Sequence, residues 1–179
     1  MKQIKQLIRE IIPVIIGILI ALLINNWNED RKDQKYLNQI FSSIEKELEE
    51  SNADIKEVIP KQQAFIDSIE IYLNNDTVSL FDIAIRANGI QAPTIKINSW
   101  KAVANSKIEL IEYEKLSALS DIEDRKENLN MRIESIAKFL YDNLKKTDKE
   151  KKEVLKILTL DAIYAEKRLQ SRIEKLIEK

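Results

Sequence analysis

The chain opens with an apolar segment that stops abruptly at polar residues. Residues 11–24 carry no charge, and the stretch GILIALLINNWNED at 17–30 passes directly from an apolar run to asparagines, a tryptophan and acids. An α-helix rises about 1.5 Å per residue, so residues 7–27 would reach roughly 31 Å, enough to cross the hydrocarbon core of a bilayer. The run has no polar face, which disfavours a buried core helix. We therefore predict a transmembrane helix.

The residues that flank this run suit the two membrane surfaces. The long stem of Arg9 lets its charge reach the headgroups, while Asn26 and Trp27 fall where the chain would enter water. No small residues follow the run with the spacing of a signal-peptidase site. We expect an uncleaved signal anchor with a cytoplasmic tail over residues 1–27 and an extramembrane domain over residues 28–179. The alternative is cleavage, which would release a soluble head.

The charges near the span do not orient it by themselves. The basic residues on its two sides balance, with Lys2, Lys5 and Arg9 before it and Arg31, Lys32 and Lys35 after it. The later group is mixed with acids, and large domains translocate readily behind a signal anchor. We predict a single-pass protein of the bacterial inner membrane, with its N-terminus in the cytoplasm and its head in the periplasm.

Four residues recur every fourth position along the span and share one helical stripe: Pro13, Gly17, Ala21 and Asn25. Gly17 and Ala21 form a small-xxx-small pair, which allows a second helix to approach closely. Asn25 would be able to hydrogen-bond across such a contact. The alternative is that small residues are simply common in membrane spans.

The polar part of the chain continues with a helical hydrophobic pattern. Apolar residues follow heptad spacing through Leu37, Phe41, Ile44, Leu48, Ile55 and Val58. We predict a long amphipathic helix that ends near Ile59, because Pro60 cannot donate a backbone hydrogen bond. A second helix, with its apolar face over residues 65–73, is expected after it.

The next segment contains signals for a short helix. Ser79 and Asp82 have the spacing of a capping box, which satisfies two backbone N–H groups at a helix start. Asn88 and Gly89 have the composition of a helix end. We predict a short helix between these signals.

The stretch that follows is the most loop-like part of the chain. Residues 90–98 are predicted to form a loop with a short extended piece over residues 94–97, and Asn98 is predicted to cap the helical stretch after it. Trp100 opens that stretch. It is either an aromatic plug where helix ends meet or an aromatic that contacts a partner or ligand.

Two further long helices complete the pattern. The first is predicted over residues 108–146, with the charged run EDRKEN (123–128) exposed to solvent, and the second from a capping box at Thr147–Glu150 to the C-terminus. Each apolar stripe must be buried against another. The chain is therefore predicted to be all-α, with an N-terminal transmembrane helix followed by an elongated antiparallel helical bundle.

Composition narrows the chemistry that is available. The chain has 2 glycines and 3 prolines, which favours long helices over turn-rich sheets, and its 29 basic and 30 acidic residues give no electrostatic basis for nucleic-acid binding. It has no cysteine and no histidine, which excludes Cys/His zinc sites and thiol or Ser–His nucleophiles. Glu45 and Glu49 share a helical face, but we interpret them as solvated. We predict no enzymatic activity, metal or cofactor.

Two stretches of the chain have a distinctive sequence. The first is GILIALLINNWNEDRK (17–32) and the second is INSWKAVANSKIELIEYEKLSALS (97–120). Together they resemble a family of single-span membrane proteins of unknown function from Bacteroidota, whose span ends in IALQINNWNE. Leu23 stands where that family usually has glutamine, and Lys107 follows Ser106 without the usual glycine. The resemblance implies an α-helical head on an inner-membrane anchor and carries over no catalytic or binding residue.

The same resemblance suggests a possible modification. That lineage glycosylates secreted proteins at Asp-Ser/Thr-aliphatic triplets, and the chain has two, Asp67-Ser68-Ile69 and Asp76-Thr77-Val78. A glycan on either triplet would favour an exported head.

These patterns lead to two functional hypotheses. The first is a membrane-anchored, non-enzymatic interaction protein of the cell envelope, which binds the bilayer and either itself or another membrane protein. The second is a sensor head that binds a small ligand between helices and signals through a partner span, which we consider the less favoured. Partner identity and stoichiometry do not follow from the sequence.

Overall fold

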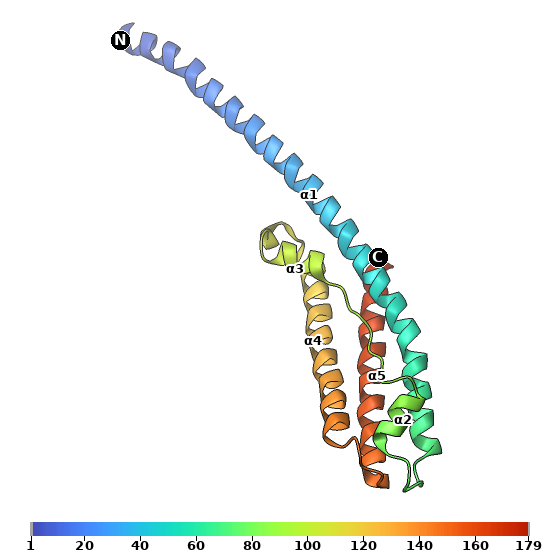
Figure 1. The fold of residues 1–179 in the computed structure, drawn as a ribbon. Helices are drawn as coiled ribbons and strands as arrows, with labels where there is room; N and C mark the ends of the chain where they lie inside the picture. Colours follow the sequence, from blue (N-terminus) through green and yellow to red (C-terminus); the bar gives the residue numbers. More distant parts are fainter. Residues whose placement is uncertain (1, 179) are drawn as a thin grey trace. The chain divides into compact units, whose positions relative to one another are not determined.

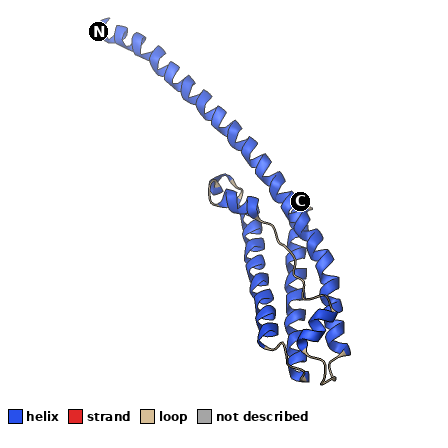
Figure 2. Ribbon diagram, viewed as in Figure 1, coloured by secondary structure: helices blue, strands red, loops and turns tan. Residues whose placement is uncertain are grey.

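The computed structural model describes the backbone of residues 2–178 and the side chains of residues 11–178. These residues form helices and connecting segments without any strand (Figure 2). The all-α fold class is thereby confirmed. The elements in chain order (Figure 1) are α1 (Lys2–Ile71), α2 (Leu80–Arg86), α3 (Asn98–Ala104), the 3₁₀ turn η1 (Ile108–Leu110), α4 (Tyr113–Asp142) and α5 (Lys149–Ile177).

The chain divides into two compact units. The first is Met1–Ser42 and the second is Ser43–Lys179, so α1 contributes to both. We call the second unit the head. This boundary after Ser42 is defined by packing, whereas the boundary expected after residue 27 is where the chain would pass from lipid to water. Residues 28–42, which lie between these two boundaries, are helical.

The head is a helical bundle. The last part of α1, α4 and α5 lie side by side, with α5 running in the opposite direction to the other two (Figure 1). One buried cluster joins α1, α2, α4 and α5, and its members are Phe65, Ile69, Leu80, Ile83, Ala84, Ile136, Leu155 and Ala162. The helical stripes identified in the sequence therefore do bury one another.

Pro60 does not end α1, contrary to the prediction from sequence. The helix continues through this residue to Ile71, so the two helices expected on either side are one. Pro60 lies on the exposed side of α1, where the carbonyl that loses its N–H partner can bond water. Behind it, Val58 and Phe65 remain buried in the head.

The boundaries of α2 agree with the sequence signals. Ser79 and Asp82 form the reciprocal capping box, with the Asp82 N–H donating to Ser79 Oγ at 3.2 Å and the Ser79 N–H donating to Asp82 Oδ2 at 3.0 Å. At the other end, Gly89 N–H donates to the Ala84 carbonyl at 2.7 Å. Asn88 takes the positive φ of 59° that this Schellman-type ending requires.

A lysine from α5 completes the end of α1. Lys152 is fully buried, and its ammonium donates to the carbonyls of Tyr72 at 3.0 Å and Asn75 at 2.7 Å. These carbonyls lie in the turn after α1, where they also accept from the backbone N–H groups of Asn75, at 3.1 Å, and Val78, at 3.4 Å. Burial lowers the pKa of Lys152, and the acids Asp76 and Asp148 act in the opposite direction.

The helix predicted over residues 108–146 is shorter than expected. Ile111 is buried with an extended backbone, which separates η1 from α4 and delays the start of α4 to Tyr113. After Asp142 the chain leaves the helix, and the carbonyls of Leu144 and Lys146 accept the first N–H groups of α2, from Phe81 and Leu80. The cap of α5 is Asp148, which accepts from Lys151 N–H, and not Thr147 as predicted.

Residues 90–97 form a segment without regular structure, which we call the connecting segment. It is held by side chains of α1: Lys96 N–H donates to Ser51 Oγ at 2.8 Å, and the Gln62 amide donates to the Gln91 carbonyl at 2.9 Å. No strand forms at residues 94–97. Asn98 is not the cap of α3. The Glu47 carboxylate takes that role, accepting from Ser99 N–H at 3.0 Å.

Candidate functional site

The first candidate site is the apolar part of α1. Its large side chains are exposed on every side of the helix, from 45% at Ile11 to 67% at Leu23. Among the described residues, this is the one helix that is long and apolar enough to cross a membrane, and none of its apolar window is buried inside the protein. A core helix of a water-soluble protein would bury these residues. The structure therefore supports a membrane span by length, composition and exposure.

The residues of the predicted stripe lie on this exposed helix. A side chain added at Gly17 would meet nothing within 4 Å, so the space beside Pro13, Gly17 and Ala21 is open in the single chain. Asn25 donates its amide to Glu29 Oε1 at 3.1 Å within the same helix. Whether a second span packs against this stripe stays a prediction.

Of the residues predicted to lie at the membrane surfaces, two have side chains that the structure describes and one does not. Asn26 and Trp27 are exposed on α1 directly after the apolar run, and Trp27 is 66% exposed. Arg9 belongs to the backbone of α1, but its side chain lies outside the described side chains. Their placement at membrane surfaces stays a prediction.

Trp100 is a buried residue of the head. Its indole is 2% exposed, and its Nε1 donates to Glu123 Oε2 at 2.7 Å on α4. The ammonium of Lys101 lies 3.5 Å from the other Glu123 oxygen. These contacts fit the aromatic plug considered in the sequence analysis, and contact with a partner stays a prediction. Glu123 belongs to the run EDRKEN, which was expected to be exposed to solvent, and this acid instead bonds to residues of α3.

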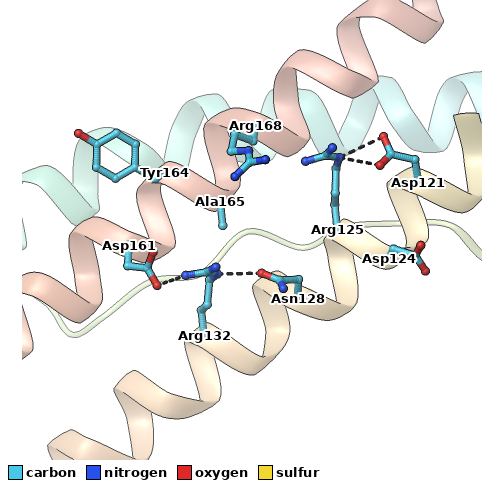
Figure 3. A pocket seen from close by; sticks show the side chains of 9 residues that line it. All are labelled: Asp121, Asp124, Arg125, Asn128, Arg132, Asp161, Tyr164, Ala165 and Arg168. Carbon is cyan, nitrogen blue, oxygen red and sulfur yellow. Dashed lines mark hydrogen bonds and ion pairs between the residues drawn. The ribbon is translucent and has the colours of Figure 1, made fainter.

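The second candidate site is a groove between α4 and α5. Its volume is about 300 Å³. Figure 3 shows that side chains from both helices line it and that most of them are charged. The lining residues are Asp121, Asp124, Arg125, Asn128, Arg132, Asp161, Tyr164, Ala165 and Arg168.

Ion pairs close the two ends of this groove. At one end, Asp121 accepts from Arg125 Nε at 3.1 Å and from Arg172 Nε at 2.7 Å. Burial would raise the pKa of Asp121, but the hydrogen bonds and charges of Arg125 and Arg172 lower it overall. At the other end, Arg132 bridges Asn128 on its own helix and Asp161 on α5.

Arg168 differs from the other arginines of the groove. It makes no hydrogen bond or ion pair with any described residue, and it extends from α5 into the space that Arg125 enters from α4 (Figure 3). Two guanidinium groups that face a shared space present planar donors suited to a carboxylate or phosphate. The sequence analysis did not select these residues. The sequence offered only a weak signal for the groove. Asp121 and Arg125 are spaced one helical turn apart, and Asp161 and Arg168 are spaced two turns apart.

The two Asp-Ser/Thr-aliphatic triplets have different settings. Ser68 is half-buried within α1, and its hydroxyl donates to the Ala64 carbonyl at 2.9 Å. Thr77 is exposed in the turn after α1, and its hydroxyl donates to Asn75 Oδ1 at 2.7 Å. Thr77 is thus the more accessible hydroxyl, and its modification stays a prediction.

Comparisons of the chain with protein-family models, with curated proteins and with solved structures found no match in any of the three. The resemblance of residues 17–32 and 97–120 to the Bacteroidota family therefore stays an expectation from sequence. The exposed apolar helix and the charged groove are the observations from which a function can be argued.

Proposed function

We propose that this protein is a non-enzymatic, membrane-anchored interaction protein of the bacterial cell envelope. Its anchor is the apolar part of α1, and its helical head lies in the periplasm. The exposure of apolar side chains around the whole circumference of residues 11–24 is the observation that carries the proposal. In water such a surface would aggregate, whereas a bilayer removes it from water.

The interaction part of the proposal rests on the stripe within the span. The open space beside Gly17 leaves room for the backbone of a second helix, and association of spans depends on such close packing. The partner is either a second copy of this chain or another membrane protein. Its chemistry is that of an apolar helix with a complementary small-residue face.

Purification of the full-length protein in mild detergent tests this proposal. We expect a stoichiometric oligomer or membrane partner, and we expect Gly17→Ile to reduce its recovery because the new side chain fills the stripe. Leu19→Ile is the matched control, since it places the same side chain away from the stripe. Equal recovery from the two variants would remove the span as the interaction surface.

The orientation can be tested because the chain contains no cysteine. Asn74 is exposed in the turn after α1, so Asn74→Cys provides a single thiol on the head. A membrane-impermeant maleimide added to intact spheroplasts should label this thiol if the head is periplasmic. Labelling only after lysis would place the head in the cytoplasm.

The groove between α4 and α5 favours a second candidate function, a sensor head for a small anion. The unpaired guanidinium of Arg168 is the observation behind it. Ligand binding to the folded state raises the thermal midpoint. Inorganic phosphate or a dicarboxylate should therefore stabilise the full-length protein in detergent but not its Arg168→Gln variant, and an equal shift in both would count against the sensor.

A further inference from the structure

Two polar side chains meet inside the head, where α1, α5 and the connecting segment come together. Gln62 is 1% exposed and Glu166 is 0% exposed. The amide Nε2 of Gln62 donates to Glu166 Oε1 at 2.7 Å and to the carbonyl of Gln91 at 2.9 Å. One amide group thus links all three elements.

The remaining oxygen of each side chain has no partner. Gln62 Oε1 and Glu166 Oε2 are buried atoms without a hydrogen bond. Exchanging the two ends of the amide would not correct this, because the carbonyl of Gln91 accepts only and must face the amide nitrogen. Buried polar atoms are rarely left without a partner, and one donor shared by these two oxygens would satisfy both.

No cation neutralises the Glu166 carboxylate. Burial is the main influence on this group and raises its pKa to about 7, while the Gln62 hydrogen bond acts in the opposite direction. On α5, the adjacent cations Lys167 and Arg168 are exposed to solvent. Charged groups on the elements around Glu166 are engaged with other residues. The pairs are Lys61–Glu57 within α1, Lys56–Glu174 between α1 and α5, Lys96–Glu50 between the connecting segment and α1, Arg125–Asp121 within α4, and Arg172–Asp121 between α5 and α4.

We propose that Glu166 is a neutral carboxylic acid in the folded head, and that its proton bridges Glu166 Oε2 to the amide oxygen of Gln62. A carboxylic acid and a primary amide pair through two hydrogen bonds in a ring, N–H to one acid oxygen and O–H to the amide oxygen. This pairing uses both orphaned atoms. The proton comes from solvent on folding and returns to solvent when the group ionises.

The pair makes the attachment of the connecting segment sensitive to pH. Ionisation leaves a negative oxygen beside the amide oxygen of Gln62, and both then require water inside the head. Water that enters there weakens the Gln62–Gln91 link. We therefore expect the connecting segment to be held firmly by the Gln62–Gln91 hydrogen bond at low pH, and to become more mobile as Glu166 ionises.

The direction of the pH effect follows from the raised pKa. Below the ordinary value of 4.5, Glu166 is protonated in both the folded and the unfolded chain. Between 4.5 and about 7 the folded chain alone retains the proton, so the contribution of this group to stability falls as pH rises through that window. Above it, the contribution is lost. The inference does not depend on the membrane assignment.

Infrared spectroscopy of the full-length protein in detergent tests the proposal. At about pH 6 ordinary Asp and Glu side chains are ionised, so the carbonyl stretch of a protonated carboxyl reports a group with a raised pKa. We expect this band in the wild-type protein, its disappearance as pH rises through about 7, and its absence from Glu166→Gln. A band that is absent from the wild type, or equal in Glu166→Gln, would overturn the proposal.

Hydrogen exchange tests the mechanical consequence. The reporters are the Thr94 amide, which donates to Asp54 Oδ2, and the Lys96 amide, which donates to Ser51 Oγ. Their protection, corrected for the intrinsic pH dependence of exchange, should fall above about pH 7 in the wild type and stay constant in Glu166→Gln, whose amide mimics the neutral acid. Glu174→Gln on the same helix is the matched control and should behave as the wild type. An ionised Glu166 bridged to Gln62 by water would show neither the infrared band nor the loss of protection. If Glu166→Gln does not fold, the wild-type infrared titration still decides the outcome.

Discussion

The apolar side chains are exposed in one part of α1 and buried in the other. Over residues 11–24 the apolar side chains surround the helix and are exposed, whereas within the head they form one stripe whose members are almost fully buried, such as Ile55 at 0% and Phe65 at 1%. The backbone is helical throughout. The difference therefore lies in what covers the side chains.

This comparison separates two sources of stability. The head buries its stripe by folding on itself, so its stability is a property of the chain. The exposed part has no covering element among the described residues and depends on lipid. A change that damages one part should leave the other intact, and three variants test this separation.

The largest effect is expected when charged residues are placed in the membrane span. Each arginine at the centre of a membrane helix costs about 2.5–3.5 kcal/mol, so Leu19→Arg with Leu22→Arg should cost roughly 5–7 kcal/mol. We expect the doubly substituted protein to leave the membrane fraction on alkaline carbonate extraction. The control places the same charges on exposed apolar residues of the head, Ile71→Arg with Ile85→Arg. Equal retention of both proteins in the membrane would contradict an anchor in lipid.

A smaller but still large effect is expected when a large side chain is removed from the core of the head. Phe65→Ala removes a buried ring, which typically costs about 3–5 kcal/mol. The midpoint of urea unfolding, followed through the tryptophan fluorescence to which the buried Trp100 contributes beside the exposed Trp27, should fall strongly while carbonate extraction remains unchanged. Phe81→Ala is the control, because Phe81 is 49% exposed and its loss should cost much less. If both variants lost the same stability, the packing described for the head would be wrong.

The smallest effect concerns the end of α1 inside the head. Lys152→Met keeps an unbranched side chain that is one heavy atom shorter and removes the donor to the Tyr72 and Asn75 carbonyls. Both carbonyls keep a backbone donor, Asn75 N–H for Tyr72 and Val78 N–H for Asn75, so the cost is that of losing hydrogen bonds from a buried ammonium. We expect it to be about 1.5–3 kcal/mol, measurable as a lower urea midpoint. Lys149→Met, at an exposed lysine paired with Glu153, should have little effect. An unchanged urea midpoint in Lys152→Met would mean that the backbone N–H partners and water are sufficient for these carbonyls.

Local signals predicted the fold where the partners are close in sequence. The capping box of Ser79 and Asp82 joins residues three apart, and it was found at the predicted place. The heptad pattern likewise indicated which side chains of α1 the head buries, because helical periodicity is set by the backbone alone. The apolar run predicted the exposed part of α1 for the same reason.

Predictions failed where a distant residue replaces the local signal. Asn98 was expected to cap α3, but Glu47, far away in sequence, supplies that acceptor. Pro60 was expected to end a helix, and packing on both sides of it keeps the helix intact. The pair of Gln62 and Glu166 and the groove around Arg168 combine residues from separate helices, so no single window of sequence contains them.

The hydrogen bonds of the connecting segment also affect how the chain folds during translation. Its bonds join residues 29 to 46 positions apart. The bond of Gln62 to Glu166 can form only after a further 104 residues have been synthesised. At about 5–20 residues per second, ribosomes need roughly 5–20 s to deliver that partner. Throughout this delay the apolar stripe of α1 has no α5 to cover it. We expect the nascent chain to engage a chaperone or the translocation machinery until α5 emerges.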